Sequence, residues 1–184
     1  MAYKIVVSGA AKTEHCCKGI EGICREVGRE IARHKCVLIT GGTTGVPYFA
    51  TLGFKEVGGI SIGFSPAISE TAHVKTYKLP TKPFDVMVYT GADYTGRNMI
   101  MTKAADGVLV ICGRMGTLHE FVTAFEIQRP VGVLEGTGGT ADKIKSIVKG
   151  PYRGYRRVFY ETEPKALVER LIKHIKERKS KVGK

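Results

Sequence analysis

Short apolar runs alternate along this chain with longer stretches in which apolar residues recur at helical spacing. The runs are continuous and rich in β-branched residues, which is typical of strands buried on both faces of a parallel sheet. They predict strands at 4–8, 36–40, 60–64, 85–90, 107–112 and 131–135, with a last edge strand at 157–160.

The stretches between these runs predict helices. The first runs from about Glu14 to His34, with Thr13 as its expected N-cap. Others are expected at 46–58, from 97, at 117–127, at 141–148 and at 164–179, whereas the 16 residues of 68–83 show no clear period and are predicted to form a lid or an edge hairpin. This order predicts an α/β fold, namely a doubly wound parallel sheet of Rossmann-like type in three α/β/α layers. Residues 1–184 are expected to form a single domain with a basic C-terminal helix and tail from about 164.

Each predicted strand ends in small residues, and in such sheets ligands bind at the carboxyl ends of the strands. The stretch 97–120 concentrates this pattern, because a helix opened by Arg97 and Asn98, a buried strand and a Gly-rich turn lead into a second helix. Helix N-termini bind anions through free N–H groups and the helix dipole. Arg97 in a first helical turn and Arg114 before the next helix would lie where the dipole disfavours a cation, so an anionic ligand is expected there.

Composition places the chain among ordinary globular proteins, with 184 residues, 43% hydrophobic and 25% charged. A cytoplasmic protein is expected, because the N-terminal sequence enters a strand directly and no apolar run reaches the roughly 20 residues that span a bilayer. The five cysteines are odd in number and two lie in strand-like runs, which favours reduced thiols. No metal site is expected, since only His15, Cys16 and Cys17 are clustered.

The net charge of +12 is concentrated near the C-terminus, where residues 142–184 hold 14 Lys or Arg and 5 Asp or Glu. The basic stretch 151–157 and the last predicted helix could hold nucleic acid through phosphate contacts. A solvated amphipathic helix with a frayed tail is the more ordinary interpretation, because no known nucleic-acid-binding pattern accompanies the charge.

Several cofactor classes are disfavoured by missing residues. The turn after the first strand lacks GxGxxG and the second strand is not followed by an acidic residue, which argues against NAD. The chain has no GxxxxGK[ST] sequence for a P-loop, and no lysine is placed as a PLP Schiff base. A smaller phosphorylated ligand, with no cofactor, is the class that remains.

Glu120 is the carboxylate best placed to act on such a ligand, and it allows two interpretations. It could stabilise charge on the ligand, or Thr117-x-x-Glu120 could be a capping box in which Glu120 only satisfies the Thr117 backbone. Asp93 could likewise hold a ribose hydroxyl, although Asp more often shapes a turn. His119 is expected to pack away from the site.

Three segments together resemble a known family: Arg97-Asn98-x-x-Met101, the run from Cys112 to Glu120, and Gly41-Gly42-Thr43-Thr44-Gly45-Val46. They are similar to motifs of the Lonely Guy phosphoribohydrolases, in the lysine decarboxylase-like superfamily that also includes molybdenum cofactor carriers. The resemblance implies a homodimer that cleaves the N-glycosidic bond of nucleoside 5′-monophosphates without metal or PLP. It implies that Arg97 and Glu120 are catalytic and that the Gly-Thr turn holds the phosphate. The residues expected to bind the ligand or its phosphate are Ser8, Gly9, Gly41, Gly42, Thr43, Gly45, Asn98, Gly113, Arg114, Met115, Gly116 and Thr117.

The sequence departs from the motifs at several positions, and its Arg97-Asn98 pair resembles the uncharacterised and molybdenum cofactor carrier-like branches of the superfamily more closely. Asn98 replaces the motif lysine, Cys112 replaces a proline and Arg114 replaces a glycine. Arg114 would either add a cation for the ligand or fill part of the pocket. Three functions therefore stay open: a phosphoribohydrolase, a non-catalytic nucleotide or molybdenum cofactor carrier or sensor, and a nucleic-acid accessory protein acting through the basic C-terminus.

Overall fold

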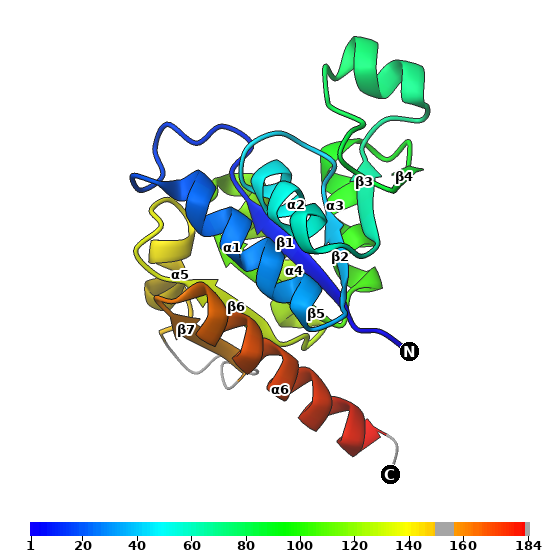
Figure 1. The fold of residues 1–184 in the computed structure, drawn as a ribbon. Helices are drawn as coiled ribbons and strands as arrows, with labels where there is room; N and C mark the ends of the chain where they lie inside the picture. The colour runs from blue at the N-terminus through cyan, green and yellow to red at the C-terminus, as the bar shows by residue number, and fades with distance from the viewer. Residues whose placement is uncertain (150–156, 183–184) are drawn as a thin grey trace.

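A computed structural model describes residues 1–149 and 157–182 of the chain (Figure 1). Over these residues seven parallel strands form one sheet in the order β4-β3-β2-β1-β5-β6-β7. Their bounds agree with the predicted runs to within two residues: β1 Lys4–Gly9, β2 Val37–Thr40, β3 Ser61–Ser65, β4 Val86–Tyr89, β5 Gly107–Ile111, β6 Val131–Leu134 and β7 Val158–Glu161.

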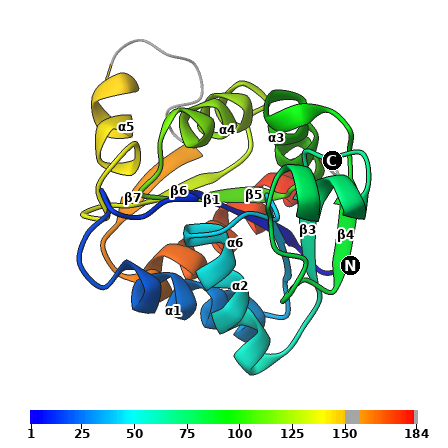
Figure 2. The ribbon, with the colours of Figure 1, turned by 90° about the horizontal axis from the view of Figure 1, so that it is seen from above.

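Helices cover both faces of the sheet, as the view along it shows (Figure 2). One face carries α1 (Ile20–Arg33), α2 (Val46–Val57) and α6 (Pro164–Val182), and the other carries α3 (Asp93–Ala104), α4 (Met115–Glu126) and α5 (Ala141–Ile147). Two apolar clusters, one on each side of the strands, make up the core. The predicted doubly wound, three-layer Rossmann-like fold is therefore confirmed.

The direction of winding changes at the centre of the sheet, between β1 and β5. Both strands are buried apart from the ends of β1, which explains their uninterrupted apolar sequences. Their register pairs Ile5 with Gly107 at one end and Gly9 with Ile111 at the carboxyl end. The turns that follow Gly9 and Ile111 consequently leave the sheet side by side, at the position where such folds bind ligands.

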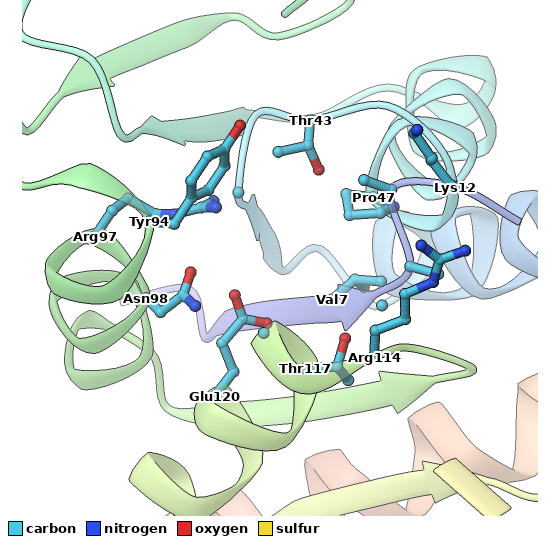
Figure 3. A pocket seen from close by; sticks show the side chains of 15 residues that line it. Val7, Lys12, Thr43, Pro47, Tyr94, Arg97, Asn98, Arg114, Thr117 and Glu120 are labelled. Carbon is cyan, nitrogen blue, oxygen red and sulfur yellow. The ribbon is translucent and has the colours of Figure 1, made fainter. Parts of the chain in front are cut away.

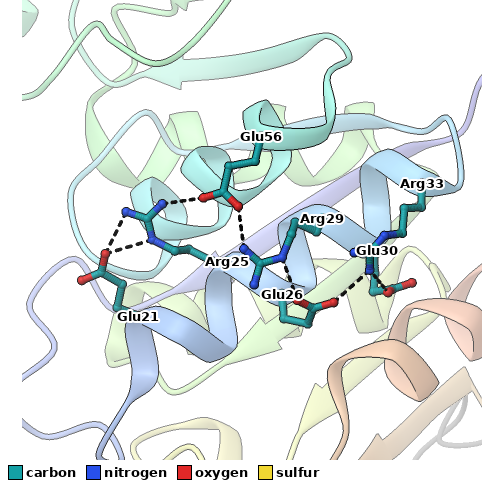
Figure 4. Close-up of polar contacts among 7 residues, drawn as sticks. All are labelled: Glu21, Arg25, Glu26, Arg29, Glu30, Arg33 and Glu56. Atoms are coloured by element: carbon teal, nitrogen blue, oxygen red, sulfur yellow. Dashed lines mark hydrogen bonds and ion pairs between the residues drawn. The ribbon is translucent and has the colours of Figure 1, made fainter.

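Glycine allows α1 and α2 to pack closely. A Cβ on Gly28 would lie 1.9 Å from the Ala50 carbonyl oxygen, and one on Gly53 would lie 2.0 Å from the Arg25 carbonyl oxygen. A ladder of ion pairs covers this contact on its outer side (Figure 4). Arg25 and Arg29 of α1 both donate to Glu56 of α2, at 2.8 and 2.6 Å, and their hydrogen bonds lower the pKa of that carboxyl.

The prediction for the N-terminal part of the first helix is wrong. The helix begins at Ile20, and its N-cap position is Gly19 with φ +78° rather than Thr13. Residues 10–19 form a loop because Cys16 is joined to Cys112 by a disulfide and the Cys17 N–H donates to the Thr137 carbonyl oxygen. The expectation of reduced thiols is therefore wrong for this pair, and the structure leaves the other three cysteines as thiols.

The segment 68–83 forms a short π-helix at Ala72–Thr76 rather than an edge hairpin. Its His73 is buried, 2.8 Å from Ser65 Oγ and 3.0 Å from the Pro80 carbonyl oxygen, so this ring has a structural role. That the segment acts as a lid stays a prediction.

The basic stretch and the C-terminal tail are only partly included in the described residues. Residues 150–156, which include all of the basic stretch except Arg157, and residues 183–184 of the tail lie outside the described residues. The final helix, α6, is amphipathic as predicted, with Leu167, Leu171 and Ile175 buried against the sheet. Across residues 1–149 and 157–182, none of the helices combines the length and the apolar character needed to cross a membrane.

Candidate functional site

A pocket of about 360 Å³ opens at the carboxyl ends of β1 and β5 (Figure 3). Its volume falls in the range of small-molecule sites, roughly 300–1,000 Å³. It is lined by Val7, Gly9, Ala10, Ala11, Lys12, Gly41, Thr43, Pro47, Tyr94, Arg97, Asn98, Arg114, Gly116, Thr117 and Glu120.

Glu120 rises into the floor of this pocket from α4. The helix begins at Met115 with Arg114 at its N-cap position, so Glu120 lies in its second turn. The side chain is buried and accepts a hydrogen bond from Ser8 Oγ of β1. Thr117 is therefore not the N-cap residue that the capping-box interpretation requires, and that interpretation is wrong.

Burial and two neighbouring groups act in opposite directions on the pKa of Glu120. Loss of solvent raises the pKa of its carboxyl, while the positive charge of Arg97 and the Ser8 hydrogen bond lower it. A carboxyl whose pKa is displaced by burial and that lines a pocket is a common feature of functional sites. The hydroxyl of Ser8 and the cation of Arg97 are the groups that favour its ionised form.

Arg97 extends from α3 at the opposite wall. It is the fifth residue of α3 and thus lies in the second helical turn, not in the first as expected. Its guanidinium is buried, which lowers the pKa, and Nη1 donates to the Phe64 carbonyl oxygen at 3.2 Å. Gly41 leaves room for it, since a Cβ there would lie 1.8 Å from Nη1. The guanidinium also lies 5.8 Å from the ring centroid of Tyr94.

Two buried polar atoms beside the pocket have no hydrogen-bond partner among the described residues. They are Nε of Arg97 and Oδ1 of Asn98. A buried donor or acceptor without a partner costs about 1–3 kcal/mol. Both residues line the cavity, so a ligand that supplies one acceptor and one donor here would recover that cost.

The opposite end of the pocket is formed by the turn before α4. The side chain of Arg114 is more than half exposed and donates from Nε to His15 Nδ1 at 3.4 Å, while another guanidinium nitrogen lies 3.8 Å from Glu14. It therefore lies at the rim rather than filling the cavity. Thr117 is buried at the start of α4, with its hydroxyl toward the opening in Figure 3. Lys12 faces the same end from the loop after β1.

The structure brings most of the sequence-predicted residues together. Gly42, Gly45 and Gly113 shape the adjoining turns with positive φ, Ser8 lies beneath Glu120, and the exposed Met115 is outside the lining. Nine predicted residues line the pocket: Gly9, Gly41, Thr43, Arg97, Asn98, Arg114, Gly116, Thr117 and Glu120.

Sequence reasoning missed six lining residues, of which Lys12 and Tyr94 carry chemistry. Each had a signal, because Lys12 follows the small residues after the first strand and Tyr94 lies one helical turn before Arg97. Asp93 begins α3 with φ +50° and accepts from the Tyr77 hydroxyl at 2.5 Å, which favours the turn interpretation of that residue.

Comparisons with known proteins cover nearly the whole chain. The model of the SLOG cluster4 family matches residues 2–168. Among solved structures, the structural-genomics target TM1055 is 28% identical, with 94% of this chain and 99% of that chain covered and a TM-score of 0.78.

Two further similar structures are those of proteins that are named for the molybdenum cofactor. The molybdenum cofactor binding protein of the phototrophic bacterium Rippkaea orientalis is 27% identical over 95% of this chain and 98% of its own, with a TM-score of 0.75. The molybdenum cofactor carrier protein of Chlamydomonas reinhardtii is 25% identical over 94% and 98%, with a TM-score of 0.74. A search of curated proteins found no match.

Proposed function

The chain belongs to the SLOG cluster4 family, and from this premise we propose that it binds a nucleotide-like phosphorylated ligand in the pocket at the carboxyl ends of β1 and β5. One observation carries the proposal: one end of the cavity has cationic side chains and a helix N-terminus, and the other end has buried polar groups. Lys12, Arg114 and the N-terminus of α4 form the first, and Arg97 with Asn98 forms the second. A ligand with a phosphate at one end and a polar ring at the other matches both.

The phosphate would lie on the turn before α4. Backbone N–H groups at a helix N-terminus and the hydroxyl of Thr117 donate to its oxygens, and the helix dipole favours its charge. Lys12 and Arg114 add two cations at the rim. The ring would lie toward Tyr94, whose exposed face can stack on a purine, pyrimidine or pterin.

Hydrolysis of the N-glycosidic bond of a nucleoside 5′-monophosphate is the reaction that these groups suit. Breaking an N-ribosyl bond builds positive charge on the sugar, which the ionised carboxylate of Glu120 can stabilise. Arg97, held by the Phe64 carbonyl oxygen, would orient the ligand and support the departing base. Ser8 would hold the carboxylate in its ionised form by donating to it.

A carrier or sensor that binds without turnover is the second candidate. Burial raises the pKa of Glu120, and a protonated carboxyl stabilises sugar charge poorly. The similarity to molybdenum cofactor binding and carrier proteins favours the same function. That cargo, a phosphorylated pterin, would present its phosphate to the same turn.

One experiment tests binding and turnover together. Purified protein is incubated with nucleoside 5′-monophosphates and with the matching nucleosides, while thermal shift reports binding and chromatography reports free base. Stabilisation by monophosphates alone supports the proposed site, and base release that Glu120→Gln abolishes supports hydrolysis. Stabilisation without release supports a carrier or sensor, and no stabilisation by any monophosphate contradicts the proposal of a nucleotide ligand.

A matched pair of lysine variants locates the phosphate. Lys12→Ala removes a cation that lines the pocket, whereas Lys18→Ala removes an exposed cation of the same loop that lies outside the lining. A hydrogen bond to a charged group contributes about 1.5–3 kcal/mol, so Lys12→Ala should weaken binding about tenfold or more. Lys18→Ala should leave binding unchanged, and equal effects of the two would argue against a phosphate at the rim.

The homodimer implied by the resemblance is a separate proposal. Met99 and Ile100 on α3 and Val122 on α4 are partly exposed apolar residues on neighbouring helices, which supports an interface there. Light scattering during size-exclusion chromatography would measure the mass. A monomer at micromolar concentration would contradict the proposal.

A further inference from the structure

A cluster of metal-ligating side chains lies on the outer side of the turn before α4. His15 and Cys16, from the loop after β1, meet Cys112 at the end of β5, with the ligand atoms of all three within 4.8 Å of one another. The two cysteines are 96 residues apart in sequence and 5.7 Å apart between Cα atoms, and the structure joins them as a disulfide. We propose that, when this disulfide is reduced, His15, Cys16 and Cys112 bind Zn²⁺.

One distance within the cluster already fits tetrahedral zinc. With Zn–S of 2.3 Å and Zn–N of about 2.05 Å, a tetrahedral angle places sulfur and nitrogen ligands about 3.6 Å apart and two sulfurs about 3.8 Å apart. His15 Nε2 lies 3.6 Å from Cys112 Sγ, so one edge of the tetrahedron already has its length. The second sulfur reaches its position when Cys16, on a half-exposed loop, moves away from Cys112 after reduction.

The protein supplies three ligands, and solvent supplies the fourth. His15 is exposed at the surface and Cys112 is buried beneath it, so the cluster is open on one side. Two thiolates balance the charge of Zn²⁺, which suits a place that already holds the guanidinium of Arg114. Arg114 now donates to His15 Nδ1, which leaves Nε2 as the protonated nitrogen. Coordination through Nε2 moves that proton to Nδ1 and releases Arg114 from His15.

The change from disulfide to zinc site balances in two steps. A phosphine reductant gives two electrons to the S–S bond between Cys16 and Cys112 and becomes a phosphine oxide. Water supplies the oxygen of that oxide and the two protons of the new thiols. Zn²⁺ then displaces both thiol protons to solvent and forms two Zn–S bonds and one Zn–N bond. The disulfide form, without thiolates, is not a ligand set of this kind.

Cobalt titration tests the site directly. Full-length protein is treated with a phosphine, freed of it without oxygen and titrated with Co²⁺, whose bonds to thiolate give strong ultraviolet charge-transfer absorption. We expect one Co²⁺ per chain in the reduced protein, displacement by Zn²⁺, and no such absorption in the oxidised protein. Cys16→Ser and His15→Gln should each weaken Co²⁺ binding at least tenfold.

Cys17→Ser provides the matched control, because Cys17 is the neighbouring thiol of the same loop and is outside the cluster. This variant should bind Co²⁺ as the wild type does, with the same absorption. Absence of thiolate absorption from the reduced wild type would overturn the proposal. So would its loss in Cys17→Ser, or its persistence at full strength in Cys16→Ser. His15→Gln changes an exposed side chain, so it gives a result even if Cys16→Ser fails to fold.

Discussion

Replacement of Gly28 by alanine should separate the effect of helix packing from the effect of helix propensity. Alanine in place of glycine inside a helix gains up to about 1 kcal/mol. At Gly28 the new Cβ would lie 1.9 Å from the Ala50 carbonyl oxygen and 2.7 Å from the Phe54 nitrogen. These are backbone atoms, so no side-chain rotation relieves the contact and α1 must move away from α2.

The cost of that movement sets the expected magnitude. Overpacking a close-packed interface costs about 1–3 kcal/mol, and a backbone contact belongs at the upper end of that range. After the gain in propensity, Gly28→Ala should lower the free energy of unfolding by about 2 kcal/mol. In a protein of this size that corresponds to a decrease in Tm of about 4–8 °C.

Gly22→Ala on the same helix is the control. Gly22 is exposed, and no atom beyond its chain neighbours and the backbone of its own helix lies within 4 Å of a Cβ built there. This variant should therefore be up to about 1 kcal/mol more stable than the wild type. Guanidinium denaturation followed by circular dichroism, with the disulfide intact, measures both variants. Equal stability of Gly28→Ala and Gly22→Ala would refute the reasoning. Gly53→Ala should also destabilise the protein. The double variant with Gly28→Ala should lose less free energy of unfolding than the sum of the two single variants, because one separation of the helices accommodates both methyl groups.

Three further outcomes are expected. Gly41→Ala should abolish the ligand-induced thermal shift by displacing the Arg97 guanidinium, and an unchanged shift would contradict this. Burial raises the pKa of Glu120, so this carboxyl should reduce the stability of the wild type as pH rises above its ordinary pKa of 4.5. The Tm of Glu120→Gln minus the Tm of the wild type should therefore increase toward neutral pH, and a decrease would contradict this. Burial raises the pKa of Cys24, and raises that of Cys36 to about 11, so mass spectrometry should find both unmodified after alkylation of the folded protein at pH 7; modification before unfolding would contradict this.

The sheet could be predicted because each strand has its own local signal. Runs such as Ile5–Val7 and Val108–Ile111 are buried on both faces, and continuous β-branched sequence is what such burial requires. The small residues after the strands predicted the edge at which the pocket lies. Helices with strong apolar periodicity, such as α6, were also predicted to within a few residues.

Residues 10–19 could not be predicted, because contacts from far along the chain hold them. The sequence between Glu14 and Ile20 contains no residue that rules out a helix, so nothing local showed that the helix begins at Ile20 rather than near Glu14. The disulfide to Cys112 and the hydrogen bond from Cys17 to Thr137 depend on how β5 and β6 come to lie beside β1. Five cysteines in a sequence do not show which two will meet.

The position of Glu120 in the structure also depends on a contact between distant parts of the chain. Spacing alone allowed a capping box with Thr117, since the first residue of a helix is uncertain by one or two positions. The structure begins α4 at Met115 and directs Glu120 toward Ser8, 112 residues earlier. The position of Arg97 in its helix was also predicted wrongly because the start of the helix was uncertain. The helix α3 begins at Asp93, so Arg97 lies in the second turn instead of the first.

The pairing of β1 with β5 also bears on how the protein folds. Gly9 and Ile111 are paired across about one hundred residues, and the pocket walls come from both sides of that pairing. Closing so long a loop is slow and occurs late, since local helices form before distant strands meet. Neither half of the chain alone could form the pocket. If a ligand binds in this pocket, then at one hundred times its Kd it should stabilise the folded state by about 2.7 kcal/mol. The protection of backbone amides against hydrogen exchange should then increase in the sheet as well as in the loops that contact the ligand.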